Sequence, residues 1–338
     1  MKQNLIETVN EYLSLGINQQ LDYEKFYLYS IITHSTAIEG STVTEIENQL
    51  LFDEGISTNK SMAEQLMNLD LKKAYEQSFI YAKSHADFSI ELLCSLAALV
   101  MQNTGSTYKT IGGDFSSAKG DLRLLNVSAG RGGKSYLAWQ KVPDRLQKFC
   151  DWLNAERKAV DKNDIHKLYE LSFEAHYRIV SIHPWADGNG RMSRLVMNMI
   201  QYEAGCIPSI VKKEKRAEYI QSLAQSQEKD DSKDFIDFMM NHHVDNLQKQ
   251  IDEYKASMES DDIKGGQKIS VGGQKKWSET TLKILELIKQ NPKISRKELC
   301  GELGINPSAV QKHIEKLKEA KMIERMGGAK GGEWRVNK

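Results

Sequence analysis

The sequence predicts a mainly α-helical protein with a small separate unit at its C-terminus. Along most of the first 255 residues, apolar side chains recur at steps of three and four, the spacing of helices that bury one face in a core. This pattern fails only in a glycine-rich stretch between Thr104 and Val142. Residues 256–277 are rich in Ser, Asp, Gly and Lys, which is typical of a linker, so residues 278–338 form a unit of their own.

Composition narrows the class of protein. The chain has 338 residues, 46 basic and 46 acidic side chains and no net charge, so no overall field attracts it to nucleic acid or to a membrane. Its N-terminus lacks an apolar signal region, and no apolar run is long enough to span a bilayer. The cysteines lie far apart without paired metal-ligand spacing, which predicts reduced thiols in a cytoplasmic protein. They are Cys94, Cys150, Cys206 and Cys300.

Residues 183–194 are the part of the sequence that carries most chemical information. They separate two segments with helical periodicity, one beginning near Ile165 and one ending before Gly205. A loop that leads into a helix N-terminus favours anions, because the first backbone N–H groups of the helix have no internal partner. Gly188 and Gly190 allow close approach of a phosphate.

Four charged or titratable side chains accompany these glycines. Arg191 and Arg194 are three residues apart, so they share a helix face and can bind further phosphate oxygens. Asp187 is a hard oxygen ligand suited to Mg²⁺ that also binds substrate phosphates. His183 has its ordinary pKa near neutrality and is the candidate general base. The alternative is an ordinary turn, since Asp-Gly and Asn-Gly occur in turns of every kind.

The stretch His183-Pro-Trp-Ala-Asp-Gly-Asn-Gly-Arg-Met-Ser-Arg194 resembles the signature of the Fic (filamentation induced by cAMP) family, with Trp185 where Phe is usual. The resemblance implies a Fic-type helical bundle that transfers AMP from ATP to a hydroxyl group of a target protein. It further implies that His183 deprotonates the target hydroxyl and that Asp187 holds Mg²⁺ on the α- and β-phosphates. The implied nucleotide-binding residues are Gly188, Asn189, Gly190, Arg191 and Arg194.

A second stretch, Ser35-Thr-Ala-Ile-Glu39-Gly40, lies at the end of a helix that we expect from about Asp22. Glu39 is either a solvated carboxylate or a group with a cationic partner, because a negative charge near a helix C-terminus opposes the helix dipole. The stretch fits the Fic inhibitory pattern (Ser/Thr)-x-x-x-Glu-(Gly/Asn). By that resemblance Glu39 pairs with Arg194 and blocks the γ-phosphate site, and residues 1–60 form an N-terminal region that carries this motif ahead of a catalytic core at 61–255.

The glycine-rich stretch between Thr104 and Val142 has two interpretations. It is a mobile surface loop, or residues 123–127 and 135–139 pair as a hairpin around a turn at 129–133. In Fic proteins this position holds the flap, a hairpin over the active site whose edge aligns the target segment by adding a strand. The resemblance therefore implies a small β-hairpin flap.

Residues 278–338 resemble a winged helix-turn-helix domain. Three short helices end in two strands, at 323–325 and 334–336, and the unit has 13 basic and 8 acidic side chains. Its candidate phosphate contacts are Lys312, His313, Lys316, Lys330 and Arg335. Because winged helices also bind proteins, DNA and protein both remain candidate partners.

The leading prediction is therefore an autoinhibited protein adenylyltransferase acting on a Ser, Thr or Tyr hydroxyl, with ATP as substrate and Mg²⁺ as cofactor. Two alternatives stay open: a transcription regulator whose core senses nucleotide, and an enzyme that removes AMP at the same site. The target protein and the oligomeric state, which could be a homodimer, do not follow from the sequence.

Overall fold

A computed structural model describes residues 2–20, 22–129, 135–263, 279–303, 305–319, 322–326 and 333–336. The described part is mainly α-helical, with two small two-stranded sheets, so the predicted fold class is confirmed. None of its helices is both long enough and apolar enough to cross a membrane. Cys94, Cys150, Cys206 and Cys300 are all free thiols.

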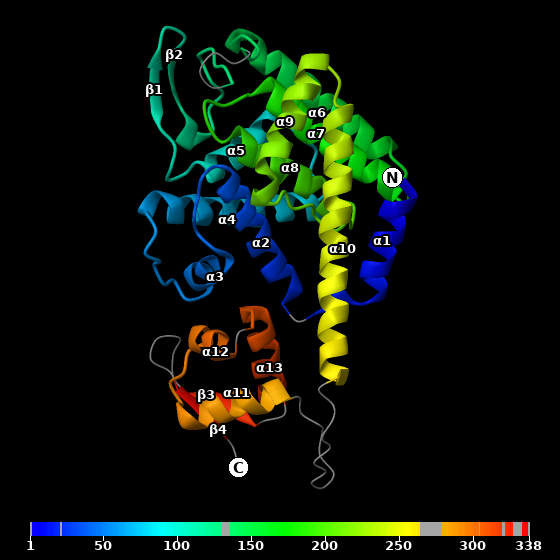
Figure 1. The fold of residues 1–338 in the computed structure, drawn as a ribbon. Coiled ribbons are helices and arrows are strands. Elements are labelled where there is room, and N and C mark those ends of the chain that lie inside the picture. Colours follow the sequence, from blue (N-terminus) through cyan, green and yellow to red (C-terminus); the bar gives the residue numbers. More distant parts are fainter. Residues whose placement is uncertain are drawn as a thin grey trace.

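Ten helices build the larger part of the fold, and Figure 1 shows them packed around α8 with the long α10 beside α1. The helices are α1 (Lys2–Ser14), α2 (Tyr23–Ile38), α3 (Glu45–Asp53), α4 (Met62–Lys83), α5 (Ile90–Val100), α6 (Val142–Ala159), α7 (Ile165–Ile182), α8 (Asn189–Glu203), α9 (Arg216–Lys229) and α10 (Lys233–Ile263). Short 3₁₀ turns lie at Ile17–Gln19, Ser117–Lys119, Trp139–Lys141 and Lys213–Lys215.

Helix α8 is the axis of this bundle. It packs most extensively against α7 and α4, and nearly all of its side chains are buried. Leu195 and Met199 belong to a hydrophobic core formed mainly with α4 to α7, whereas Met197 belongs to a second core formed with α1, α7, α9 and α10. Each fully buried Leu or Met contributes about 1.5–3 kcal/mol. The two cores therefore fix the helix that follows the signature loop.

The N-terminal helices share these cores. Ile31 and Ile32 of α2 lie in the first core, and Leu5 and Tyr12 of α1 lie in the second. The Tyr12 hydroxyl also donates a hydrogen bond of 2.9 Å to Gln250 Oε1 on α10. Residue 60, the expected end of an N-terminal region, is therefore not a boundary of the packing.

Side-chain caps set several helix ends. Thr44 and Glu47 form a capping box at the start of α3, and Ser61 and Glu64 form another at the start of α4. At the other end of the bundle, α10 continues to Ile263, past residue 256, where we expected a linker to begin. Polar side chains are compatible with a solvated helix, so composition alone placed that boundary too early. Residues 264–278 lie outside the described residues.

The glycine-rich stretch contains one regular hairpin and one much weaker pairing. Strands β1 (Thr107–Thr110) and β2 (Gly113–Ser116) pair antiparallel, which the sequence analysis did not foresee. At the hairpin that we predicted, the pairing is limited to a bridge between Ser128 and Ser135 and a 3.0 Å hydrogen bond from the Tyr136 N–H to the Val127 carbonyl. Of the predicted turn at 129–133, residues 130–133 lie outside the described residues.

The C-terminal unit has its own hydrophobic core. It consists of α11 (Glu279–Gln290), α12 (Arg296–Leu303), α13 (Pro307–Glu319), β3 (Ile323–Met326) and β4 (Glu333–Val336), and β3 pairs antiparallel with β4. Ile284, Ile314 and Trp334 are among its buried residues. This arrangement is the predicted winged helix-turn-helix.

Candidate active site

The signature loop connects α7 to α8. His183 caps α7 in the left-handed conformation, with φ of 53°, which turns the chain sharply out of the helix. Gly188 has φ of 82° at the N-terminus of α8, a conformation that glycine adopts without strain. A Cβ atom at Gly188 would also lie 2.9 Å from Met101 Sδ. The loop backbone is therefore fixed at both ends by its own sequence.

Trp185 and Asn189 hold the middle of the loop. The Trp185 side chain is 1% exposed, and its Nε1–H donates a 3.1 Å hydrogen bond to the Gly120 carbonyl. The Asn189 amide accepts from the Trp185 N–H at 3.1 Å and donates to the Trp185 carbonyl at 2.8 Å. Trp185 thus lies in the core, and the Asn189 side chain is hydrogen-bonded within the loop. Only the Asn189 backbone N–H remains for a phosphate.

The imidazole of His183 is neutral at physiological pH. Its ring stacks on Tyr136 with centroids 3.9 Å apart. Burial lowers the pKa of His183 to about 4, an effect to which the Arg123 cation adds. Nδ1 lies 3.4 Å from the Val180 carbonyl oxygen, which favours the tautomer with the proton on Nδ1. Nε2 then carries the free lone pair.

The first turn of α8 forms an anion-binding surface. The first backbone hydrogen bond of the helix runs from the Met192 N–H to the Gly188 carbonyl, so the N–H groups of residues 189–191 precede the helical ladder. Arg191 is 3% exposed and donates to the Val100 carbonyl at 3.3 Å and to Met101 Sδ at 2.9 Å. Its buried Nε has no hydrogen-bond partner among the described residues. An anion at this helix end would supply one.

Arg194 is buried and fully engaged. Its Nε donates to Ser35 Oγ at 2.8 Å, and one terminal nitrogen donates to both the Ser35 carbonyl at 2.9 Å and Glu39 Oε1 at 2.6 Å. The other terminal nitrogen lies 3.3 Å from the Tyr219 hydroxyl. The Arg194 guanidinium group thus contacts Ser35 and Glu39, which lie 159 and 155 positions away in the chain. Arg191 and Arg194 share a face of α8 but reach different neighbours.

Glu39 lies directly over the anion-binding turn. A Cβ atom at Gly190 would lie 2.5 Å from Glu39 Oε1, so the carboxylate fills the space next to this glycine. Burial raises the pKa of Glu39, but Arg194, Arg191 and Arg216 together hold it below its ordinary value. The group is therefore an ionised carboxylate beside the first turn of α8. Gly40, with φ of 103°, ends the stretch from Ser35 to Gly40 in a conformation that favours glycine.

A buried polar network fixes α2, which carries Glu39. Asn68 on α4 accepts hydrogen bonds from Thr36 at 2.8 Å and Asn48 at 2.9 Å, and it donates to Ser41 at 3.2 Å. Asn48 on α3 also donates to Thr33 at 2.7 Å. Because buried polar groups are costly to leave unpaired, this network keeps α2 and the following turn in one place.

Asp187 is the candidate metal ligand. Its side chain is 61% exposed, and Oδ1 accepts a 2.6 Å hydrogen bond from the Gly188 N–H. Among the described residues, no group of three His, Cys, Asp or Glu side chains could hold a metal ion by itself. One outward carboxylate beside an anion site fits Mg²⁺, which commonly binds through one or two carboxylates together with substrate phosphates.

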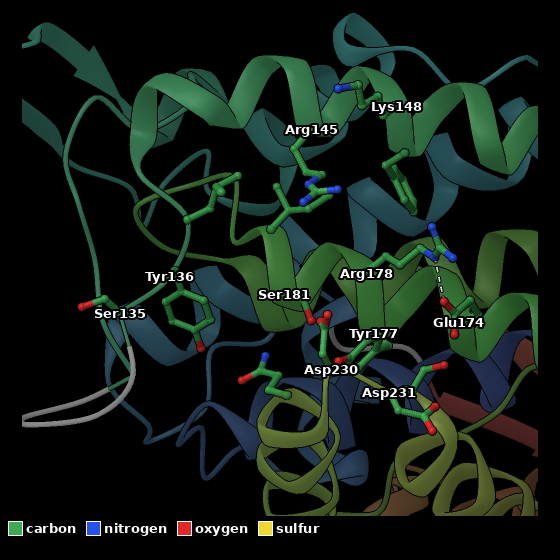
Figure 2. Close-up of a pocket in the computed structure, with 15 residues that line it drawn as sticks. Ser135, Tyr136, Arg145, Lys148, Glu174, Tyr177, Arg178, Ser181, Asp230 and Asp231 are labelled. Carbon is green, nitrogen blue, oxygen red and sulfur yellow. Dashed lines mark hydrogen bonds and ion pairs between the residues drawn. The ribbon is translucent and has the colours of Figure 1, made fainter.

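A pocket of about 560 Å³ adjoins the base. Figure 2 shows it between Arg145 and Lys148 of α6, Tyr177 and Arg178 of α7, and the turn that follows α9, with Tyr136 at one side. Because Tyr136 also stacks on His183, the pocket and the signature loop share a wall. Its volume lies within the range of small-molecule sites.

Two residues that contact His183, Arg123 and Tyr136, carry no signal in the sequence for this role. Arg123 donates a 2.7 Å hydrogen bond from Nε to the His183 carbonyl, and Tyr136 stacks on the imidazole. Both were recognised only as parts of a candidate hairpin. No sequence signal marks an arginine that binds main-chain carbonyls.

Family comparisons agree with this geometry. Residues 87–201 match the model of the Fic/DOC family, and residues 278–324 match that of winged helix-turn-helix DNA-binding domains. Each match is a similarity over that segment of the chain: the first includes the signature loop, and the second lies in the C-terminal unit.

Similar proteins include adenylyltransferases. Protein adenylyltransferase fic-1 of Caenorhabditis elegans is 27% identical over 241 residues, which cover 70% of this chain and 43% of the relative. Protein adenylyltransferase Fic of Drosophila melanogaster is 27% identical over 264 residues, which cover 75% of this chain and 46% of the relative. The chain thus spans less than half the length of these relatives.

Solved structures share the fold. A Fic domain containing signaling protein from Bacteroides thetaiotaomicron superposes with a TM-score of 0.62 at 21% identity, covering 75% of this chain and 98% of that chain. A Fic family protein from Desulfovibrio desulfuricans gives a TM-score of 0.58 at 18% identity, covering 99% of this chain and 95% of that chain.

Proposed function

We propose that the chain is a protein adenylyltransferase that transfers AMP from ATP to a Ser, Thr or Tyr hydroxyl group of another protein. The observation that carries the proposal is the loop from His183 to Arg194, which presents a neutral base beside an anion-binding helix N-terminus. The Fic/DOC match and the adenylyltransferase relatives support the same reaction class. The free thiols fit a reducing compartment, which for this protein we take to be the cytoplasm.

The reaction is an in-line displacement at the α-phosphorus of ATP. The target hydroxyl oxygen bonds to the α-phosphorus, the bond to the oxygen that bridges to the β-phosphate breaks, and pyrophosphate leaves. The hydroxyl proton passes to Nε2 of His183, which is free because Nδ1 faces the Val180 carbonyl. The protein contributes mainly position and charge, as in other phosphoryl-transfer sites.

The phosphates are bound by the first turn of α8. Backbone N–H groups of Asn189, Gly190 and Arg191 bind phosphate oxygens, and the Gly190 position lets them approach closely. The guanidinium groups of Arg191 and Arg194 complete the cradle. Asp187 would hold Mg²⁺, which when bound neutralises phosphate charge and polarises the α-phosphate.

We further propose that Glu39 restrains this activity. Its carboxylate occupies the space beside Gly190 and pairs with Arg194, so a γ-phosphate competes with it for both. Ser35 and Tyr219 hold the Arg194 guanidinium independently of Glu39. Withdrawal of Glu39 would therefore free an N–H donor that is already correctly oriented.

Substitution of the base tests the proposed reaction. In His183→Ala, label transfer from ATP to protein should fall by about a hundred- to ten-thousand-fold, while ATP binding persists. His166→Ala, on the same helix but paired with Glu170, is the matched control and should retain the parent rate. Transfer at the parent rate in His183→Ala would reject His183 as the base.

A second candidate function is nucleotide-dependent DNA regulation, which the winged helix-turn-helix match favours. Lys312 and Lys316 on α13 are exposed, as a phosphate-contacting surface requires. His313 instead lies 2.7 Å from Thr281 on α11, and Arg335 pairs with Glu324 at 3.5 Å. Lys330 lies outside the described residues. Reversible ATP binding together with DNA binding, without covalent label on protein, would favour this function. Release of AMP from modified protein would instead indicate that the site removes AMP.

A further inference from the structure

Arg123 is a buried cation without an acidic partner among the described residues. Its side chain is fully buried, and burial alone shifts its pKa, with no contribution from an Asp or Glu of the described chain. Burial lowers the pKa of Arg123, although a guanidinium group stays protonated in proteins. Removing such a charge from water costs several kcal/mol unless good hydrogen bonds compensate. A residue kept under these conditions needs a physical explanation.

The compensation comes from three backbone carbonyl groups. Nε donates to the His183 carbonyl at 2.7 Å, and the terminal nitrogens donate to the Leu125 carbonyl at 2.7 Å and the Leu137 carbonyl at 2.5 Å. The Arg123 N–H adds a 3.0 Å hydrogen bond to the Pro184 carbonyl. The Arg123 side chain thus joins the His183 carbonyl to Leu125 and Leu137, which lie on either side of residues 127–136.

This connection determines where Tyr136 lies. Tyr136 precedes Leu137, and its ring stacks on His183 with an interplanar angle of 17°. The Tyr136 N–H donates a hydrogen bond to the Val127 carbonyl. This bond therefore lies next to the Leu125 and Leu137 carbonyls, which accept hydrogen bonds from Arg123. If the Leu125 and Leu137 carbonyls were released, the Tyr136 ring and the pairing would lose their common support.

We propose that Arg123 is a positioning residue for the transfer reaction, fixing His183 and both flanks of the flap in one geometry so that Tyr136 closes over the imidazole. The inference rests on the proposed adenylyltransferase function, because it assigns Arg123 a role through His183. Lysine cannot replace it, since one ammonium group does not reproduce a planar fork that reaches three carbonyls in fixed directions. The structure thus links the flap, which would receive the target segment, to the base.

The effect on His183 combines geometry with charge. The groups that face the imidazole are the Arg123 cation, the Asp187 and Glu39 carboxylates and the Tyr136 ring. Arg123 disfavours the imidazolium form, whereas the two carboxylates favour it. Arg123→Lys keeps the cation and changes mainly the geometry. Tyr136→Ala keeps the cation and exposes the imidazole.

The experiment compares Arg123→Lys, Tyr136→Ala and the matched control Arg157→Lys in the Glu39→Gly protein. Arg157 is also largely buried and joins α6 to Glu203 of α8, away from the signature loop. Three quantities are measured: the rate of label transfer, ATP affinity and hydrogen exchange of the Tyr136 amide. Arg123→Lys should lose at least about tenfold in rate with ATP affinity retained, and Tyr136 exchange should accelerate by a similar factor.

The other two variants separate positioning from general destabilisation. Arg157→Lys should change neither the transfer rate nor Tyr136 exchange. Tyr136→Ala, at a half-buried position, should lower the transfer rate. It should also raise the pKa of His183, because the imidazole becomes more exposed, so transfer should fail at a higher pH than in the parent.

Parent-like transfer and exchange in Arg123→Lys would overturn the proposal, as would equal losses in Arg157→Lys. A rate loss in Arg123→Lys without faster Tyr136 exchange would also overturn it. If the Glu39→Gly protein transfers no label at all, the proposed function fails, while Tyr136 exchange still decides whether Arg123 holds the flap.

Discussion

Replacing Glu39 with glycine removes one carboxylate at the C-terminal end of α2. In the structure this carboxylate pairs with Arg194 at 2.6 Å and lies against Gly190. Glycine leaves the space for a phosphate oxygen and leaves Arg194 oriented by Ser35 and Tyr219. We therefore expect Glu39→Gly to bind ATP with its γ-phosphate on Arg194 and to transfer label faster than the parent.

The size of this effect follows from the ion pair. A hydrogen bond between charged partners contributes about 1.5–3 kcal/mol. The Glu39 side chain is 34% exposed, so water screens the pair and we take about 1.5–2 kcal/mol. Because each 1.4 kcal/mol corresponds to about a tenfold change, the competent state should gain about ten- to thirtyfold. The rate of transfer should increase by at least about tenfold.

The assay is auto-modification or target modification with labelled ATP. The matched control is Glu54→Gly, because Glu54 also caps a helix C-terminus and pairs with an arginine, Arg296 at 2.9 Å, away from the signature loop. Glu54→Gly should label at the parent rate. The gain in Glu39→Gly should disappear with His183→Ala and largely disappear with Arg194→Ala. Unchanged labelling in a folded, ATP-binding Glu39→Gly protein would refute autoinhibition by Glu39.

Three further predictions concern pH, packing and the C-terminal unit. Because the folded-state pKa of His183 is about 4, its imidazole is already deprotonated between about pH 5 and about pH 8. The transfer rate should therefore change little across that pH range. A fall in rate near the ordinary histidine pKa would show that burial does not lower the pKa of His183. Trp185→Phe removes the hydrogen bond to Gly120 and should lower the free energy of unfolding by about 1 kcal/mol in urea titrations, whereas an unchanged value would show that the bond contributes nothing. Residues 278–338 should unfold cooperatively as an isolated fragment because they have their own core, and an unfolded fragment would contradict this. Any affinity of the fragment for DNA should fall steeply with salt concentration, and DNA binding that does not depend on salt would contradict phosphate contacts.

The features that sequence predicted well are local in the chain. The apolar periodicity predicted helix α7, because that signal depends on residues within a few positions of one another. The pairing of Glu39 with Arg194 spans 155 positions and came from a family resemblance, since no local pattern encodes it.

Features that depend on main-chain carbonyls or on distant packing could not be predicted. Arg123 binds three carbonyl groups, and carbonyls are present at every residue, so the sequence does not distinguish the ones that it contacts. The stack of Tyr136 on His183 depends on how the whole flap folds back. Glycines at 112 and 113 could have indicated the turn between β1 and β2, but each strand has only four residues and its pattern is too short to recognise.

In the proposed reaction, a target hydroxyl group attacks the α-phosphorus of ATP while His183 accepts its proton. The most direct measurement supplies the Glu39→Gly protein with ATP labelled in the adenine, at the α-phosphate or at the γ-phosphate, and follows covalent label on protein together with pyrophosphate release. Our account predicts equal incorporation of adenine and α-phosphate label, no γ-phosphate label and one pyrophosphate for each AMP transferred. Incorporation of γ-phosphate label, or reversible binding without any covalent label, would contradict it.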